Sequence, residues 1–218
     1  YSMETIGFIG LGNLGTAIAQ NIQNAGYPMV VYDIREGATK PLLKEGSRLA
    51  AAPDEVASLS DVTFTSLPGP REVEDVTLGL HGVVNGIKEG GIYVDLSTSR
   101  PSLIRRIGEI FEEKSVKVLD APVLTSPATA ADRQVVVMPS GDREVYQKLR
   151  PLFDSFADTV VYQGPLEMGS TCKLVNNMIT LAVRQVVAEG LTLGVKAGLD
   201  LDSLMEAGNR MVLGHQEE

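Results

Sequence analysis

Short apolar runs alternate with segments of helical periodicity from the start of the chain to about residue 163. The apolar runs predict strands at residues 5–10, 28–33, 61–67, 91–96, 116–119, 134–138 and 159–162. The segments between them predict helices at residues 13–25, 38–45, 70–78, 101–114 and 142–154, with a further helix beginning at Pro53. Apolar strands separated by helices are typical of a parallel sheet covered on both faces, so we predict a doubly wound α/β domain.

The pattern changes after Gly164-Pro165. No strand signal remains over residues 166–197, and apolar positions at helical spacing predict one helix roughly 45 Å long. Only one short helix follows, at residues 201–207, and so few residues cannot bury the flanks of so long a helix. We therefore predict a sheet domain at 1–164. At 165–218 we expect an interdomain helix and part of a truncated all-α domain, which further chain or a partner completes.

The composition narrows the choice of partners and compartments. A formal net charge of −9 with no basic run argues against nucleic-acid binding and against attraction to anionic membranes. We also expect no apolar run long enough to span a bilayer. The single Cys172 cannot form an internal disulfide, which favours a cytoplasmic protein or another reducing intracellular compartment. His81 and His215 share no metal-ligand spacing, so we expect no metal site.

Six residues between the first strand and the first helix fit the pattern G-x-G-x-x-G in the setting where it is informative. The first glycine permits a tight turn, the second lets the backbone approach a pyrophosphate, and the third lets helix and strand pack closely. The start of the helix offers free N–H groups and a partial positive charge to the phosphates. The turn therefore predicts a Rossmann domain that binds a dinucleotide cofactor through Gly10, Leu11, Gly12, Asn13, Leu14 and Gly15.

An acidic residue ends the second predicted strand. Asp33 lies 18 residues after Gly15, where a carboxylate accepts hydrogen bonds from the adenine-ribose hydroxyls and repels a 2′-phosphate. Arg35 is the counter-signal, because a cation there can pair with that phosphate. The sequence therefore favours NAD as the cofactor and leaves NADP possible.

The sequence around the glycine turn reads GFIGLGNLG from Gly7. Three further motifs follow it along the chain. Leu67-Pro68 ends a predicted strand, Asp95-Leu96-Ser97-Thr98 precedes Pro101, and GSTCKLVNN begins at Gly169. Together these motifs resemble the β-hydroxyacid dehydrogenase family, the group of 3-hydroxyisobutyrate dehydrogenase and tartronate semialdehyde reductase. The resemblance extends from residue 6 to about residue 200. It implies that the cofactor is contacted by Leu67, Pro68 and Thr98, and that the substrate is bound in part by Ser97.

The last of these motifs places a lysine and an amide on one helical face. Lys173 and Asn177 are four residues apart, so they face the same way at the start of the long helix. The resemblance implies that Lys173 exchanges a proton with the substrate hydroxyl while a hydride moves to or from nicotinamide. It also implies that Asn177 holds the substrate hydroxyl or carboxylate. We therefore predict that both residues bind the substrate and take part in catalysis.

One motif departs from the family pattern. The family sequence Asp-Ala-Pro-Val-Ser-Gly-Gly stands here as residues 120–126, which end in Leu124, Thr125 and Ser126. The family turn presents a hydroxyl and N–H groups to the substrate carboxylate, whereas Leu124 has no hydroxyl and two side chains replace two glycines. We predict that these three residues bind the substrate. The change leaves the substrate class open.

These features predict an enzyme, an NAD(P)-dependent oxidoreductase that transfers a hydride between nicotinamide and a small 3-hydroxy acid or its semialdehyde. One alternative is a reductase of another C=O or C=N substrate, which the altered turn favours. A second is a non-catalytic dinucleotide-binding module, which the short helical part favours. Gly190, Gly194 and Gly198 lie four residues apart. The first two favour close packing against another helix, and Gly198 predicts the C-cap of the long helix. This spacing also favours a homo-oligomer formed through the helical domain.

Overall fold

The computed structural model describes residues 4–125, 130 and 132–212. Its contacts divide the chain into two compact units, Tyr1–Leu174 and Val175–Glu218. The first unit holds the sheets and the helices that cover them, and the described part of the second unit consists of helices and the turn between them. The domain boundary that the sequence predicts falls earlier along the chain and stays a prediction.

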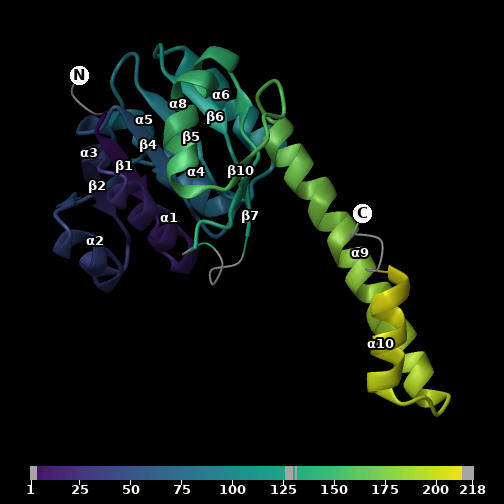
Figure 1. Cartoon of the computed structure of the whole chain (residues 1–218). Coiled ribbons are helices and arrows are strands. Elements are labelled where there is room, and N and C mark those ends of the chain that lie inside the picture. Colours follow the sequence, from purple (N-terminus) through teal and green to yellow (C-terminus); the bar gives the residue numbers. More distant parts are fainter. Residues whose placement is uncertain (1–3, 126–129, 131, 213–218) are drawn as a thin grey trace. The chain divides into compact units, whose positions relative to one another are not determined.

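A seven-stranded sheet forms the centre of the first unit (Figure 1). Its strands are β1 (Ile6–Ile9), β2 (Met29–Tyr32), β3 (Arg48–Leu49), β4 (Val62–Thr65), β5 (Ile92–Asp95), β6 (Lys117–Asp120) and β9 (Ser140–Gly141). They lie in the order β3-β2-β1-β4-β5-β6-β9, and all neighbours pair in parallel except β9, which is antiparallel to β6. The order runs outward from β1 in both directions, which confirms the predicted doubly wound Rossmann fold.

Two of the predicted strands do not join this sheet. β8 (Val136–Val137) pairs in antiparallel fashion with β7 (Val123–Leu124) and in parallel with β10 (Thr159–Val160), forming a separate three-stranded sheet. The prediction that residues 134–138 and 159–162 extend the parallel sheet is therefore wrong. Apolar periodicity reports that a strand is buried, but it does not identify the partner strand.

Helices cover both faces of the main sheet (Figure 1). They are α1 (Asn13–Asn24), the 3₁₀ turn η1 (Glu36–Thr39), α2 (Lys40–Lys44), α3 (Pro53–Ser58), α4 (Pro70–Leu78), α5 (Val83–Gly86), α6 (Pro101–Glu112), α8 (Arg143–Phe156), α9 (Met168–Lys196) and α10 (Leu201–Val212). Side chains of α1, α2 and α8 pack on one face, and those of α3, α4, α5 and α6 pack on the other. The helix predicted to begin at Pro53 is confirmed by α3. Proline suits the first turn of a helix, which explains why the helix begins there.

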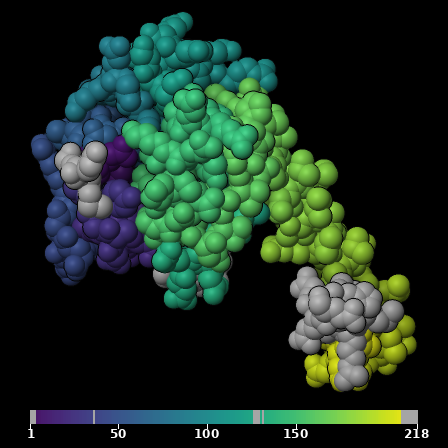
Figure 2. Space-filling view, turned by 45° about the horizontal axis from the view of Figure 1, so that its top comes forward, coloured from purple at the N-terminus to yellow at the C-terminus, as the bar shows by residue number. Residues whose placement is uncertain are grey.

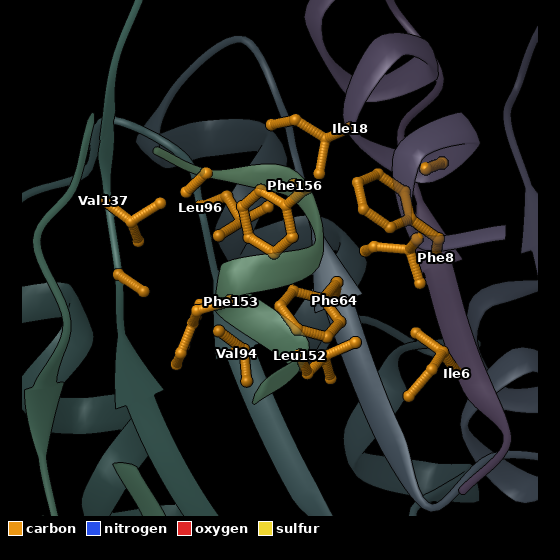
Figure 3. Close-up of a cluster of buried hydrophobic side chains, with 14 of the residues drawn as sticks. Ile6, Phe8, Ile18, Phe64, Val94, Leu96, Val137, Leu152, Phe153 and Phe156 are labelled. Carbon is orange, nitrogen blue, oxygen red and sulfur yellow. The ribbon is translucent and has the colours of Figure 1, made fainter. Parts of the chain in front are cut away.

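Aromatic side chains fill the core between α8 and the sheet (Figure 3). Phe8 of β1 stacks on Phe64 of β4 with ring centroids 6.0 Å apart. Phe153 and Phe156 of α8 meet the Phe64 ring edge-on, at 6.4 and 6.3 Å. In the space-filling view the green α8 adjoins the purple N-terminal elements (Figure 2). This packing fixes the strand β1 whose carboxyl end leads into the glycine turn.

The second unit contains the rest of α9 and α10. Gly198, with a φ of 96°, follows α9 in the left-handed conformation of a C-cap, as the sequence predicts. At Gly194 an added Cβ would lie 2.5 Å from Cδ2 of Leu204, whereas a Cβ added at Gly190 would have nothing within 4 Å beyond its own helix backbone. The close helix packing that the glycine spacing predicts is therefore found at Gly194, against α10.

The helix α9 corrects one expectation from the sequence. An 18-residue window of it has a mean hydropathy of 1.4, and none of that window is buried, so α9 is long and apolar enough to cross a membrane. The prediction that no run reaches this limit is wrong, because neutral residues such as Thr180 interrupt the apolar run without adding charge. The core helix of a soluble protein passes the same test of length and composition. The finding therefore identifies an uncovered apolar helix and not its partner.

Candidate dinucleotide and catalytic site

The three glycines of the turn meet three different surroundings. Gly10 has a φ of 93°, and a Cβ there would lie 2.3 Å from the carbonyl oxygen of Ser66. A Cβ at Gly15 would lie 2.0 Å from the carbonyl oxygen of Gly10, because α1 packs directly on the turn. Nothing lies within 4 Å of the corresponding position at Gly12. Protein atoms therefore leave no room for a side chain at Gly10 or Gly15. The space at Gly12 is open, and a ligand can approach the backbone there.

The first turn of α1 begins directly after this open position. Gly12 is the N-cap residue, and among the described residues no side chain caps the helix or adds an acidic group to its first turn. Its N–H groups and partial positive charge therefore remain for an anion. The hydroxyl of Thr16 donates to the carbonyl oxygen of Leu11 at 2.9 Å, which ties the turn to the helix. This arrangement suits a bound pyrophosphate.

The carboxylate of Asp33 joins the end of β2 to the glycine turn. It accepts the N–H of Leu11 at 2.6 Å with Oδ2, and the N–H of Arg35 at 2.8 Å with Oδ1. The Arg35 guanidinium donates to Asp33 Oδ1 at 3.1 Å and to the carbonyl oxygen of Leu11 at 3.2 Å. Burial alone would raise the pKa of Asp33, but the hydrogen bonds from Arg35 and Leu11 outweigh it and lower the pKa. An ionised Asp33 therefore shapes the turn, a role that the sequence did not predict.

The same pair bears on the choice of cofactor. The side chain of Asp33 is 6% exposed and that of Arg35 is 64% exposed. A carboxylate suited to ribose hydroxyls and a cation suited to a 2′-phosphate thus lie together after β2. The geometry fits both NAD and NADP.

The loops after β4 and β5 are joined by a hydroxyl. Ser97 Oγ accepts the N–H of Leu67 at 2.9 Å, and the N–H of Ser97 donates to Asp95 Oδ1 at 3.0 Å. Ser97 is buried, whereas Pro68 is exposed and Thr98 is partly exposed. The residues predicted to contact the cofactor therefore present surface, while the hydroxyl predicted to bind substrate holds the two loops together.

Two buried carboxyl groups stand at the carboxyl ends of neighbouring strands. Asp95 of β5 is the register partner of Asp120 of β6, and both are fully buried. Thr65 Oγ1 donates to Asp95 Oδ1 at 2.8 Å and also contacts the hydroxyl of Tyr93 at 2.8 Å. Burial raises the pKa of Asp95, against the hydrogen bonds from Ser97 and Thr65. Sequence reasoning gave these carboxylates no role, although each is the last residue of its strand, at the edge where ligands bind in such sheets.

Lys173 lies in the first turns of α9. Its ammonium donates to the carbonyl oxygen of Val123 at 2.7 Å, and half-burial lowers the pKa of Lys173 below its usual value. The structure thereby brings Lys173 to the segment where the sequence places substrate binding. There Leu124 is half-buried, and Thr125 Oγ1 donates to the carbonyl oxygen of Gln134 at 2.8 Å. Ser126 lies outside the described residues, and Asn177 belongs to the second unit, so the predicted roles of both stay predictions.

The fold and the open glycine turn define this chain as a dinucleotide-binding protein of the Rossmann class. Residues 5–164 match the family model described as the NAD binding domain of 6-phosphogluconate dehydrogenase. The chain is 32% identical over 200 residues to the mitochondrial 3-hydroxyisobutyrate dehydrogenase of Mus musculus, covering 91% of the chain and 59% of that enzyme. It belongs to the β-hydroxyacid dehydrogenase family of NAD(P)-dependent oxidoreductases.

Two further relatives show the same likeness. An uncharacterized oxidoreductase of Bacillus subtilis is 32% identical over 204 residues, covering 94% of the chain and 71% of that protein. The structure of 3-hydroxyisobutyrate dehydrogenase from Mycobacterium tuberculosis with L-serine is 28% identical, with a TM-score of 0.86, covering 95% of the chain and 70% of that structure. The chain therefore spans between 59% and 71% of the length of these three proteins.

Proposed function

We propose that the protein transfers a hydride between a nicotinamide cofactor and a small 3-hydroxy acid or its semialdehyde. The observation that carries this proposal is the half-buried amine of Lys173, held at the carbonyl oxygen of Val123 in a chain that also has an open dinucleotide turn. The relatives of this chain that are named 3-hydroxyisobutyrate dehydrogenases support the substrate class. L-serine, present in the Mycobacterium tuberculosis structure, is itself a 3-hydroxy acid.

Lys173 supplies the proton chemistry in this proposal. A nicotinamide cofactor, when bound, would supply the acceptor or donor of the hydride, and the substrate oxygen would lose a proton in the oxidation or gain one in the reduction. A neutral amine takes the hydroxyl proton in the oxidation, and an ammonium returns it in the reduction. Half-burial lowers the pKa of Lys173, so more of the neutral amine is present near neutral pH than in an exposed lysine. The ammonium also stabilises negative charge that develops on the substrate oxygen.

The remaining substrate contacts follow from the family resemblance. We assign Asn177 to the substrate hydroxyl or carboxylate, and the segment beginning at Leu124 to substrate binding, as the family resemblance implies. A second candidate, reduction of another C=O or C=N group, is favoured by two residues of that segment. Leu124 has no hydroxyl to offer a carboxylate, and the Thr125 hydroxyl donates to the carbonyl oxygen of Gln134. Both features weaken the recognition of an acid at this turn.

A substrate panel tests the proposal. Turnover of 3-hydroxy acids, semialdehydes and imines is followed by nicotinamide absorbance, with wild type, Lys173→Ala and the surface variant Lys148→Ala. Lys173→Ala should lower kcat by about 10²- to 10⁴-fold and leave the Kd of NADH unchanged, while Lys148→Ala keeps full turnover.

Each other result of the substrate panel supports a different function. Turnover that survives in Lys173→Ala removes Lys173 from the mechanism. Turnover of imines or other carbonyl compounds alone supports the second candidate. NADH binding without turnover of any substrate indicates a non-catalytic dinucleotide-binding module.

A further inference from the structure

Two buried side chains hold the start of α9 against the main sheet. Asp120, at the end of β6, accepts the N–H of Ser170 at 2.6 Å with Oδ2 and the Ser170 hydroxyl at 2.8 Å with Oδ1. Ser140 of β9 accepts the N–H of Gly169 at 2.9 Å and donates to the carbonyl oxygen of Asp120 at 3.2 Å. Asp120, Ser140 and Ser170 are all buried. Two N–H groups of the first turn, those of Gly169 and Ser170, therefore donate to side chains of the sheet.

The helix also lies in direct contact with the strand backbone at this point. A Cβ at Gly169 would lie 2.5 Å from the carbonyl oxygen of Met138, 2.7 Å from that of Asp120 and 3.0 Å from Cδ of Pro122. No larger residue fits without moving the helix away. The absence of a side chain at Gly169 therefore lets the start of α9 lie directly on the backbone of the sheet domain.

One short segment of chain holds both this helix start and the proposed catalytic amine. Asp120 binds Ser170, and Val123, three residues later, accepts the Lys173 ammonium at 2.7 Å. Ser170 and Lys173 are also three residues apart, so they lie on neighbouring positions of one helical face. The first two turns of α9 are thereby attached at two points to the segment from Asp120 to Val123. A shift of the helix that breaks the first attachment also moves the amine at the second.

We propose that Asp120 is a positioning residue for Lys173, acting through Ser170 to hold the first turn of α9 where the amine meets the Val123 carbonyl. The proposal rests on the proposed function for its effect on turnover, but the attachment itself stands on the contacts given above. Asp95, the register partner on β5, and Tyr93 are the titratable groups that also face this buried carboxyl. Neither of them contacts the helix start directly among the described residues.

Three variants and two matched controls test this role in the full chain. Ser170→Ala and Asp120→Ala remove the attachment, and Asp120→Asn keeps one oxygen as an acceptor for the Ser170 N–H. Asp142→Asn changes the aspartate that caps α8, where Oδ1 accepts the N–H groups of Glu144 and Val145. Ser155→Ala removes a hydroxyl that donates within α8. Thermal unfolding identifies any variant that does not fold, and Ser170→Ala serves if Asp120→Ala fails.

Turnover provides the first measurement. Ser170→Ala and Asp120→Ala should lower kcat by about 10- to 100-fold with little change in the Kd of NADH, because a small displacement of a catalytic group costs rate more than cofactor binding. Asp120→Asn should recover part of the loss. Both controls in α8 should stay within about twofold of wild type.

The second measurement does not depend on activity. Acetylation of Lys173 by acetic anhydride, followed by peptide mass spectrometry across a range of pH, reports the pKa and accessibility of that amine. Loss of the attachment should expose Lys173 and raise its labelling midpoint toward the ordinary lysine value, while labelling of Lys148 in the same samples stays the same. Folded Ser170→Ala protein with unchanged Lys173 labelling would overturn the proposal. A shifted midpoint in a protein that turns over no substrate would instead overturn the proposed function and leave the positioning role standing.

Discussion

At the scale of single residues, Asp33 has two tasks that mutation can separate. It accepts the N–H of Leu11 in the glycine turn, and it stands where a ribose hydroxyl would bind. Its neighbour Arg35 donates to the same carboxylate and remains 64% exposed. The relative contributions of the two side chains therefore decide which dinucleotide binds more tightly.

Asp33→Ala should weaken NADH binding by about tenfold or more and NADPH binding by less, because the carboxylate favours the ribose and repels the 2′-phosphate. Arg35→Ala should do the reverse. Titration of nicotinamide fluorescence with each cofactor measures the four affinities. Asp33→Asn is the matched control, since its amide oxygen still accepts the Leu11 N–H. Equal losses of NADH and NADPH in Asp33→Ala would restrict Asp33 to holding the turn.

Asp120 makes a second prediction at this scale, for the dependence of stability on pH. Burial raises its pKa to about 7, against the hydrogen bonds from Ser170, and the charge of Asp95 raises it further. Between the ordinary aspartate pKa of about 3.9 and this value, the unfolded chain releases the proton while the folded chain keeps it. The contribution of Asp120 to the free energy of unfolding is therefore greatest below about pH 4, and it is lost as the pH rises through about 7.

Wild type should thus lose roughly 2 to 3 kcal/mol of unfolding free energy relative to Asp120→Asn between about pH 5 and pH 8. Urea unfolding at the two pH values measures the difference. Asp142→Asn is the control, because hydrogen bonding by the Val145 N–H and Lys117 lowers the pKa of Asp142, so its contribution is lost only at acid pH. A wild-type difference that stays constant across this range would show that Asp120 titrates normally.

At the scale of elements, the glycine turn and α1 separate packing from ligand binding. Gly15 lies against the carbonyl oxygen of Gly10, and Gly12 faces open space. The two positions are three residues apart in the same motif, yet only one of them is closed by the protein. Alanine at each position therefore tests a different physical effect.

Gly15→Ala should cost about 1 to 3 kcal/mol of stability, because its Cβ must push α1 away from the turn. Gly12→Ala should change stability by only a few tenths of a kcal/mol and still abolish most NADH binding, because the methyl group occupies the space of the pyrophosphate. Thermal unfolding and NADH titration of both variants measure the two effects. A Gly12→Ala variant that binds NADH normally would place the pyrophosphate elsewhere.

The elements also show where reasoning from periodicity ends. The strands of the parallel sheet and the helix at Pro53 could be predicted because buried strands and helix starts have local signatures in sequence. The small sheet of β7, β8 and β10 could not, because each of its strands pairs over only two residues. Its pairings join strands that are separated in the sequence, and no local pattern records such a choice of partner.

At the scale of the whole molecule, the second unit presents an uncovered apolar surface. Met178, Leu181, Val186 and Leu193 of α9 are between 62% and 71% exposed. Contiguous apolar surface of this kind marks an interaction site in a soluble protein. We propose that a second copy of the chain covers it, with Gly190, where an added Cβ would have nothing within 4 Å, open to close helix packing.

Sedimentation velocity should therefore find a dimer or a larger oligomer, and Leu181→Glu with Val186→Glu should dissociate it, because each buries a charge in the interface. Leu80→Glu, at an 87% exposed position in the first unit, is the matched control and should leave the assembly intact. A monomeric wild type would contradict the proposal. Flotation of that monomer with phosphatidylcholine vesicles would assign the surface to a membrane.

The sequence by itself determined the doubly wound sheet, the dinucleotide turn and the family, because strand burial, helix starts and Gly10 to Gly15 are patterns among near neighbours. Only the tertiary structure decided what Asp33, Ser97 and Asp120 contact. The bonds of Ser170 to Asp120 and of Lys173 to Val123 each join residues fifty positions apart. Such contacts depend on which strand ends meet which helix start, and that is settled by packing the whole sheet domain together.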